Sequence, residues 1–311
     1  MSTLIKYNED YAIKPNGFHN NGSICYFNAL LQSMLSCTSF IKKIKERTPY
    51  NNNNNNNILE LFNEMIDSYN INNYSNIILN KLITSQKIKD FGGQQCAGEG
   101  FSYLFDSIPE IHNLFLHRYC THLYCVDCEK WISKVNNLCH LFTIDPELQV
   151  VQLDKFKHID EREKKIFAEL SNTNNLSDLN KYLIKQNTYV DKDYKCPNCK
   201  KTGEKYKLNY LVMIPEILVI MSKKYNNQLQ KINVNTEFTE ELFFNTKYGQ
   251  LKYTAVSQIE HSGGVGGGHY WSVSKRKDGW YLFNDNSFSK CEFKPTNNTY
   301  IVFYHLYSII S

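Results

Sequence analysis

Cys25 stands where a protein can make a thiol reactive. The run of apolar residues from Tyr26 to Leu35 predicts a helix that begins near Cys25 and is too apolar for an exposed position. The unpaired N–H groups and positive dipole end of a helix N-terminus stabilise a thiolate. Asn20, between Gly17 and Gly22, supplies an amide that can donate to an oxyanion. Because a cysteine at a helix start is more often a small buried hydrophobe, partners elsewhere must support a catalytic role.

A histidine far downstream has the surroundings expected of a base for this thiol. His269 follows a glycine-rich run and opens a predicted strand, 269–275, that would hold its ring. The next predicted strand, 279–283, ends at Asn284 and Asp285. Adjacent strands would bring Asn284 to His269, where its oxygen accepts the ring N–H and fixes the tautomer, with Asp285 as the alternative partner. Each feature alone also fits a loop, a surface histidine or a turn, but the order Cys, His, Asn is that of papain-type cysteine proteases.

Four further cysteines form two C-x-x-C pairs, a spacing suited to metal: Cys125, Cys128, Cys196 and Cys199. Each pair places two thiolates on a tight turn, and four thiolates suit tetrahedral zinc in a closed structural site. The alternatives are a redox pair or chance. Two pairs in one chain favour a single structural zinc, and a reducing compartment would keep the other thiols free.

Length and composition set broader limits. The chain has 311 residues, of which 42% are hydrophobic, and its formal net charge is +4 with the charges spread along the sequence. We therefore expect a sizeable core and no nucleic-acid partner. The N-terminus lacks a signal peptide, and no segment reaches the ~18 apolar residues of a membrane span. The expected protein is a monomer inside the cell, in the cytoplasm and the nucleus, without a membrane partner.

The predicted elements are helices first and an antiparallel sheet later, which gives an α+β fold. A second amphipathic helix begins at Ile58. The asparagine tract 51–57 has no apolar group to bury and is predicted to be a disordered insertion. A short helix is predicted over 176–183. Residues rich in Val, Ile, Tyr and Phe predict strands over 206–221, 231–244, 251–259, 269–275, 279–283 and 300–304.

The segment around Cys25 resembles the first motif of the ubiquitin-specific proteases, G-x-x-N-x-G-x-x-C-Y-x-N-x-x-L-Q. Residues 17–32 are GFHNNGSICYFNALLQ. The family's last motif pairs Gly-His-Tyr with W-Y-x-F, and it is similar to residues 268–270 and 280–285. Residues 94–101 are similar to the family's Q-Q-D-A-x-E-F region, with Cys96 in place of the aspartate. The similarity therefore extends over nearly the whole chain.

This resemblance implies a papain-like fold with a helical thumb, a β-sheet palm and zinc-pinned β fingers. The catalytic domain would cover 17–305, with fingers at about 118–210, after a lead-in of 1–16 and before a C-terminal tail of 306–311. The fingers would grip ubiquitin while its C-terminal tail enters a narrow channel. The residues implied to bind that tail are Gln94, Gln95, Gly268 and Tyr270.

The implied activity is hydrolysis of the (iso)peptide bond after the C-terminal glycine of ubiquitin through a Cys25 thioester. His269 would deprotonate Cys25, and Asn20 with the Cys25 N–H would hold the oxyanion, without a catalytic cofactor. Ubiquitin and ubiquitinated proteins would be the partners. Two alternatives stay open: an adaptor that binds ubiquitin but cuts weakly, which Cys96 favours, and a protease for a ubiquitin-like modifier.

Overall fold

The computed structural model describes residues 8–20, 22–47, 58–70, 80–82, 95–144, 189–190, 193–203, 205–226, 228–232, 236–246, 249–264 and 266–310. The asparagine tract 51–57, the predicted helix 176–183 and Gln94 lie outside these ranges. No helix within them is long and apolar enough to cross a membrane.

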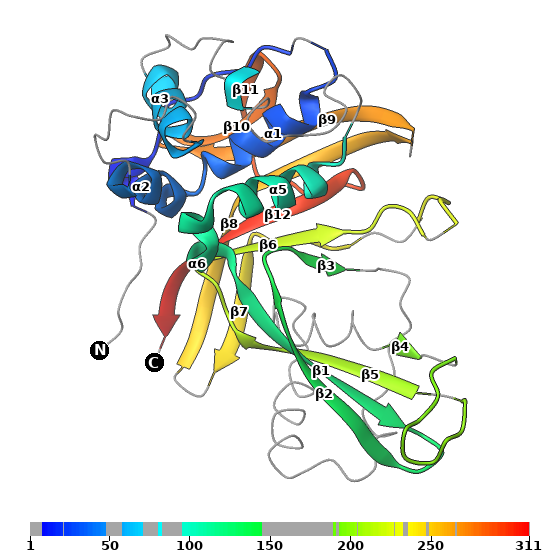
Figure 1. Ribbon diagram of the computed structural model, residues 1–311. Helices are drawn as coiled ribbons and strands as arrows, with labels where there is room; N and C mark the ends of the chain where they lie inside the picture. The colour runs from blue at the N-terminus through cyan, green and yellow to red at the C-terminus, as the bar shows by residue number, and fades with distance from the viewer. Residues whose placement is uncertain are drawn as a thin grey trace.

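Helices gather at one end of the molecule (Figure 1). They are η1 (Glu9–Tyr11), α1 (Cys25–Met34), α2 (Thr38–Arg47), α3 (Ile58–Asn70), α5 (Ala97–Ser107), η2 (Pro109–Ile111) and α6 (His112–Phe115). The helices α1 and α3 begin at or next to the predicted positions. All ten residues of α1 are buried, as its apolar surface requires.

A buried arginine fixes α1 on the sheet. Arg276 Nη1 donates to Ser36 Oγ at 2.7 Å, and Nη2 donates to the carbonyl of Gln32 at 3.3 Å. These acceptors lie at the C-terminal end of α1, where a cation is favoured by the helix dipole. On the neighbouring strand, Ser257 Oγ donates to Ser33 Oγ at 2.8 Å. The helix that carries Cys25 is therefore held against the sheet by hydrogen bonds as well as by apolar packing.

The larger sheet has eight strands in the order β11-β10-β9-β8-β12-β6-β3, with β7 paired to β8. Among the strands that the structure describes, only β3 and β6 pair in parallel. The strands are β3 (Phe142–Ile144), β6 (Ile217–Ser222), β7 (Glu241–Thr246), β8 (Gly249–Gly264), β9 (Gly267–Arg276), β10 (Gly279–Asn284), β11 (Ser287–Cys291) and β12 (Thr299–Ile310). Their inward residues form two apolar clusters, one beneath the helices and one between β6, β7, β8 and β12.

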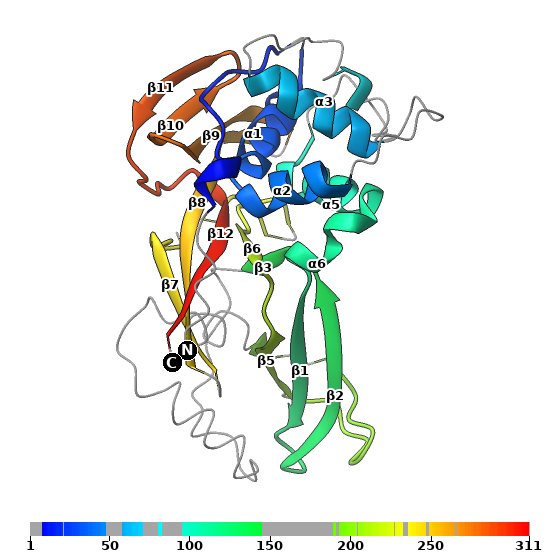
Figure 2. The same cartoon turned by 90° about the vertical axis from the view of Figure 1, so that its left-hand side faces the viewer.

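A second sheet extends away from the helices (Figures 1 and 2). Its four strands have the order β2-β1-β5-β4, and every pair is antiparallel. They are β1 (His117–Cys125), β2 (Lys130–Cys139), β4 (Tyr189–Val190) and β5 (Lys205–Met213). This finger sheet carries all four cysteines of the C-x-x-C pairs at or beside its far end.

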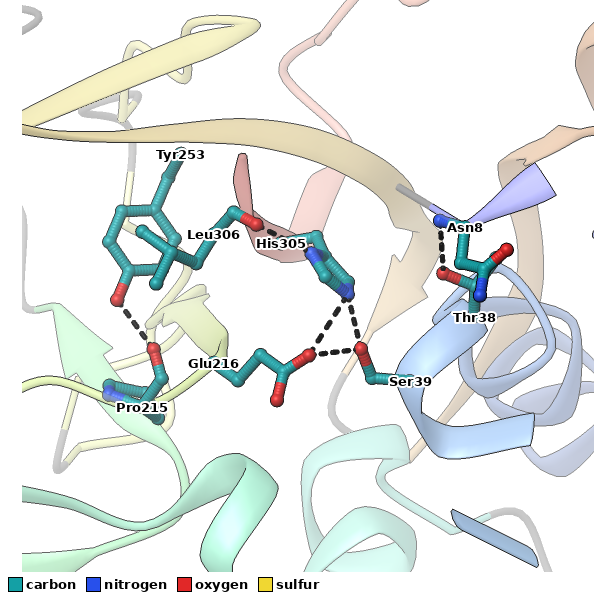
Figure 3. Close-up of polar contacts among 8 residues, drawn as sticks. All are labelled: Asn8, Thr38, Ser39, Pro215, Glu216, Tyr253, His305 and Leu306. Carbon is teal, nitrogen blue, oxygen red and sulfur yellow. Dashed lines mark hydrogen bonds and ion pairs between the residues drawn. The ribbon is translucent and has the colours of Figure 1, made fainter. Parts of the chain in front are cut away.

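A polar network joins α2 to the larger sheet (Figure 3). Ser39 Oγ donates to Glu216 Oε1 and lies 2.7 Å from His305 Nε2, while His305 Nδ1 lies 2.9 Å from the Leu306 carbonyl. These residue types also make catalytic triads, but a triad needs the serine and the carboxylate on opposite ring nitrogens. Here Glu216 Oε1 approaches the same Nε2, at 3.7 Å. The network is therefore a partly buried structural contact and not a second catalytic centre.

Three expectations differ from the structure. The segment 206–221, predicted as one strand, is two strands, because Pro215 lies between β5 and β6 and proline lacks a donor for the ladder. Of the described residues in 231–244, only those from Glu241 onward are in a strand. Residues 306–310, expected as part of a tail, complete β12 and pair with β8.

Candidate active site

Cys25 is the first residue of α1 and is buried. Burial raises the pKa of its thiol, and the nearby Asp285 carboxylate raises this pKa further. Backbone N–H groups of Tyr270, Tyr26 and Cys25 itself act in the opposite direction. Burial and Asp285 therefore favour the protonated thiol, while the N–H groups are donors that would stabilise negative charge once a base removes the proton.

His269 and Asn284 meet across neighbouring strands. Their residues lie on β9 and at the end of β10, which pair in antiparallel register. The Nε2 atom of His269 lies 2.6 Å from Asn284 Oδ1. An amide oxygen can only accept, so Nε2 carries the hydrogen and Nδ1 is the basic nitrogen. The next residue, Tyr270, directs its N–H to the Cys25 sulfur, so β9 contacts the start of α1 one residue after His269.

Asp285 has a different partner from the one considered as an alternative in the sequence. Its Oδ2 accepts from Asn20 Nδ2 at 3.0 Å, and its Oδ1 accepts from Asn28 Nδ2 at 2.8 Å. The two adjacent residues therefore have different partners: Asn284 contacts the histidine, and Asp285 contacts two amides. Asn28 was not singled out from the sequence. Its spacing of three residues from Cys25, nearly one helical turn, is the signal that could have identified it.

Asn20 is held on both sides. Its Oδ1 accepts from the N–H of Gly22 at 3.0 Å and of Ile24 at 3.4 Å, which fixes the turn before α1. Gly22 has φ +143, a conformation in which a side chain is strained. Since one amide hydrogen goes to Asp285 and Oδ1 faces the turn, the second amide hydrogen can go to another acceptor.

The segment that precedes α1 packs tightly against the residues that follow β10. The N–H of Phe18 donates to the Asp285 carbonyl at 2.9 Å. A Cβ on Gly17 would lie 2.3 Å from the carbonyl oxygen of Asn286. Only glycine permits this approach, so the first and last sequence motifs depend on each other in space.

The hairpin of β8 and β9 carries two of the residues expected to bind a substrate tail. A Cβ on Gly268 would lie 2.4 Å from His261 Nε2, so a side chain there would displace that histidine. The ring of His261 packs on Tyr270 at 4.4 Å between centroids. Tyr270 is buried, and burial raises the pKa of its hydroxyl. These contacts shape the wall next to His269.

On the other side, Gln95 and Cys96 directly precede α5. The Cys96 sulfur lies 2.9 Å from the Tyr300 hydroxyl, and Tyr270 packs 6.2 Å from Tyr300 between ring centroids. The position of the family's aspartate is thus occupied by a neutral thiol that already has a hydroxyl partner. Gln94 lies outside the described residues, and Gln95 lies beside this wall.

The four cysteines of the finger sheet come together as a metal-binding cluster. Their sulfur atoms all lie within 4.8 Å of one another, with Cys125 and Cys199 at 3.8 Å and Cys128 and Cys196 at 3.8 Å. Tetrahedral zinc with Zn–S bonds of ~2.3 Å requires sulfur atoms about 3.8 Å apart. The cluster therefore has the composition and the spacing of a closed structural zinc site.

The thiols of this cluster differ in pKa. For Cys196, burial raises the pKa, but N–H groups of Cys199 and Asn198 and the neighbouring thiols bring it below the ordinary value. For Cys128, burial and hydrogen bonds to the other three thiols raise the pKa. Neighbouring thiols cannot all ionise without a cation between them. The donor set therefore fits a bound Zn²⁺, which would let all four bind as thiolates.

The geometry agrees with a comparison to known families. A family model described as ubiquitin carboxyl-terminal hydrolase matches residues 16–304. The chain belongs to this hydrolase family. The resemblance to ubiquitin-specific proteases predicted from the sequence is thereby confirmed.

Relatives in this family are much longer than the matched segment. The chain is 28% identical to human ubiquitin carboxyl-terminal hydrolase 15 over 136 residues, 40% of this chain and 14% of that protein. It is 25% identical to ubiquitin carboxyl-terminal hydrolase 5 of Saccharomyces cerevisiae over 228 residues, 65% of this chain and 26% of that protein. The matches thus cover about a quarter or less of the length of these hydrolases.

Solved structures with the same fold include the Ubp8-Sgf11-Sgf73-Sus1 SAGA DUB module, with TM-score 0.70, 16% identity and coverage of 97% of this chain and 70% of that chain. The same module bound to ubiquitin aldehyde matches with TM-score 0.69, 18% identity and coverage of 100% and 72%. This likeness establishes the fold. The predicted α+β class, with thumb, palm and fingers, is confirmed.

Proposed function

We propose that this chain hydrolyses the (iso)peptide bond after the C-terminal glycine of ubiquitin through a thioester on Cys25. The observation that carries this proposal is the contact of His269 Nε2 with Asn284 Oδ1 at 2.6 Å. This contact leaves Nδ1 as the basic nitrogen, which would accept the proton of the Cys25 thiol. Membership of the hydrolase family and the ubiquitin aldehyde bound to a protein of the same fold support it.

In the first step, His269 Nδ1 takes the proton of Cys25 as the sulfur attacks the glycine carbonyl carbon. A C–S bond forms and the carbonyl oxygen becomes an oxyanion. The free amide hydrogen of Asn20 and the N–H of Cys25 would donate to it. Asp285 would hold the Asn20 amide in this direction through its 3.0 Å hydrogen bond. Such fixed donors act without reorganisation during the reaction.

Collapse of this intermediate expels the amine of the substrate lysine, which receives the proton from His269. Water then attacks the thioester and passes a proton to the same Nδ1; the C–S bond breaks, the modifier leaves with a C-terminal carboxylate, and the proton returns to the Cys25 sulfur. The hydrogen bond to Asn284 keeps the ring in one orientation through both steps. Because the resting thiol has a raised pKa, proton transfer would accompany attack on substrate and would not precede it as a stable ion pair.

The substrate tail would lie between the β8–β9 hairpin and the start of α5. Gly268, Tyr270 and Gln95 line or adjoin this region, and Gln94 directly precedes Gln95 in the chain. The absence of a side chain at Gly268 would let an extended backbone pass close to the wall. Ubiquitin and ubiquitinated proteins are the proposed partners, and residues 17–305 the proposed catalytic domain.

Zinc would be held by Cys125, Cys128, Cys196 and Cys199 and would supply structural cross-linking of the finger turns, not catalysis. Tetrahedral ligation by four thiolates leaves no position for a substrate. The described strands of the finger sheet, β1, β2, β4 and β5, would then present a rigid surface to the bound modifier.

A ubiquitin-like modifier is the second candidate substrate, and one observation favours it. At the position of the family's aspartate this chain has Cys96, which carries no carboxylate. The Cys96 sulfur lies 2.9 Å from the Tyr300 hydroxyl. A channel without that carboxylate has less attraction for a basic tail.

The test is hydrolysis of fluorogenic C-terminal amides of ubiquitin and of ubiquitin-like modifiers by the wild-type chain and by Cys25→Ser. Cleavage of the ubiquitin amide by the wild type only is the expected result. Cleavage of a ubiquitin-like amide alone would replace the substrate assignment. Equal slow cleavage by both proteins would overturn the assignment of Cys25.

A further inference from the structure

Cys125 has a lysine opposite it on each neighbouring strand of the finger sheet. In the β1–β2 ladder its partner is Lys130, and in the β1–β5 ladder it is Lys205. The two lysines differ in burial, since Lys130 is exposed and Lys205 is 0% exposed. Burying an ammonium group costs free energy unless it is paired, so the position of Lys205 requires a charged partner.

Two acceptors face this buried ammonium. Lys205 Nζ lies 3.3 Å from Asp127 Oδ2, and Lys205 is the residue opposite Cys125 in the β1–β5 ladder. Asp127 Oδ2 in turn lies 3.9 Å from the Cys125 sulfur. The ammonium, the carboxylate and this sulfur thus lie together at the end of β1.

The backbone makes room for this arrangement. A Cβ on Gly203 would lie 2.8 Å from Asp127 Oδ2, so a side chain there would push the carboxylate away. Asp127 is the third residue of the first C-x-x-C turn, and Gly203 lies four residues after the second. Both metal-binding segments therefore contribute to holding the carboxylate.

The charges explain why a cation is needed here. Zn²⁺ with four thiolates has a net charge of about −2, and the Asp127 carboxylate adds a negative charge 3.9 Å from one sulfur. Like charges at this distance repel, whereas an ammonium donating to both reduces the charge on each.

We propose that Lys205 is a positioning residue of the zinc site: its ammonium, held by Asp127, donates to the Cys125 thiolate and stabilises the metal-bound cluster. The proposal rests on zinc as the occupant of the cluster and is independent of the hydrolysis of ubiquitin. Partners of this kind orient ligands and typically contribute 10–100-fold to metal affinity.

A simpler role would be that Lys205 only neutralises Asp127. Four variants of the full chain separate the two roles: Lys205→Met, Asp127→Asn, the double variant, and Lys130→Met as the matched control. If Lys205 acts on the thiolate, zinc affinity falls with Lys205→Met and stays low in the double variant. If it only neutralises the carboxylate, the double variant recovers wild-type affinity.

The measurement is zinc transfer from each purified, zinc-loaded chain to a chromophoric chelator, followed at equilibrium. We expect Lys205→Met to bind zinc about 10–100-fold more weakly than the wild type and Lys130→Met to stay within about twofold. Wild-type affinity in Lys205→Met, full recovery in the double variant, or an equal loss in Lys130→Met would each overturn the proposal.

A second pair of variants covers the case in which Lys205→Met does not fold. Lys205→Arg keeps a cation that can donate, and Lys205→Gln keeps a donor without the charge. Zinc retention in the arginine variant with loss in the glutamine variant supports the role of the charge. Equal zinc affinity of the two contradicts it. Alkylation of the four cysteines, read by mass, gives an activity-independent check, because exposed thiolates react when zinc leaves.

Discussion

Cys25 and the four-cysteine cluster are both sulfur sites with buried members, yet their surroundings differ. Cys25 is one thiol near a carboxylate, and both its burial and Asp285 raise its pKa. In the cluster, four thiols approach within 4.8 Å, and Cys196 and Cys128 shift in opposite directions. The first site keeps its proton until a base removes it, whereas the second requires a cation before all its thiols can ionise. The groups that surround each sulfur, together with burial, thus distinguish the two cysteine sites in this chain.

The largest expected effect comes from removing the Cys25 sulfur. Cys25→Ser should lower the hydrolysis rate of a ubiquitin C-terminal amide by on the order of 10⁴-fold or more, since a hydroxyl with this base is a much poorer nucleophile. Zinc content should not change. Cys291→Ser, on β11, is the matched control and should keep wild-type rate and zinc. An equal loss of activity in both variants would contradict the division between the two regions.

Removing zinc should loosen the finger sheet and leave the elements of the active site largely unchanged. Structural zinc contributes about 10 kcal/mol or more to the folding of small zinc sites, so a chelator should loosen the finger sheet. We expect backbone hydrogen exchange in β1, β2 and β5 to rise by at least about tenfold, with little change in α1 and β9. Unchanged exchange in the finger strands after complete zinc removal would show that the cluster is not a structural cross-link.

A smaller effect tests how Asp285 connects to the active site. Asp285→Asn removes the charge-assisted hydrogen bonds to Asn20 and Asn28, so kcat should fall about 100-fold with little change in KM. The same substitution removes a charge that raises the Cys25 pKa. Alkylation of Cys25 should therefore begin at lower pH than in the wild type.

The combination is diagnostic, because the thiol becomes easier to ionise while catalysis becomes slower. Asp278→Asn is the control: this exposed carboxylate accepts from Tyr281 at 2.7 Å and should leave both kcat and alkylation unchanged. A rise in kcat for Asp285→Asn would mean that Asp285 acts only through the thiol pKa and does not orient Asn20.

The smallest expected effect is a change in the pH dependence of stability, and it arises where the finger sheet begins. Burial lowers the pKa of His117, the first residue of β1, to about 4. A folded-state pKa below the unfolded value of about 6.5 stabilises the fold above pH 6.5, and this stability is lost as pH falls towards 4. Between pH 7 and pH 5 the free energy of unfolding should drop by about 2 kcal/mol from this residue.

His117→Phe should remove that part of the pH dependence, because the ring lies among Tyr119 and Phe142 and phenylalanine has no titrating group. Denaturant unfolding at pH 7 and pH 5 measures the difference between the two proteins. The same pH dependence in the variant and the wild type would contradict the assignment to His117.

The sequence was informative where one chain segment determines the local structure. The apolar run after Cys25 predicts α1, and the alternation of β-branched and aromatic residues predicts β8, β9 and β10 close to their observed bounds. The resemblance implied β fingers at about 118–210, but the residue pattern did not predict the individual strands β1 and β2. They contain many polar residues, including Asn136 and Asn137, and their pairing along the fingers is a long-range property.

The site could be predicted only in part for the same reason. The residue types and their order identified Cys25 and His269 as candidates. Which of two adjacent residues meets the histidine depends on where β10 ends and on the left-handed φ of 52 at Asp285, which turns the second side chain towards Asn20. Asn28 stands in the first motif and Lys205 in none, but the motif does not name the partner of Asn28, since both roles arise from contacts across 257 and 78 residues of sequence.

The most direct test of the central claim is covalent trapping with an electrophile attached to the C-terminus of ubiquitin. Wild type, Cys25→Ser and a zinc-ligand variant, Cys199→Ser, are incubated with the probe, and the intact mass and the modified residue are determined. The account predicts one ubiquitin adduct on Cys25 in the wild type, none in Cys25→Ser, and Cys25 as the only modified residue whenever Cys199→Ser reacts. An adduct on any other cysteine, or no adduct with a folded wild-type chain, would contradict it.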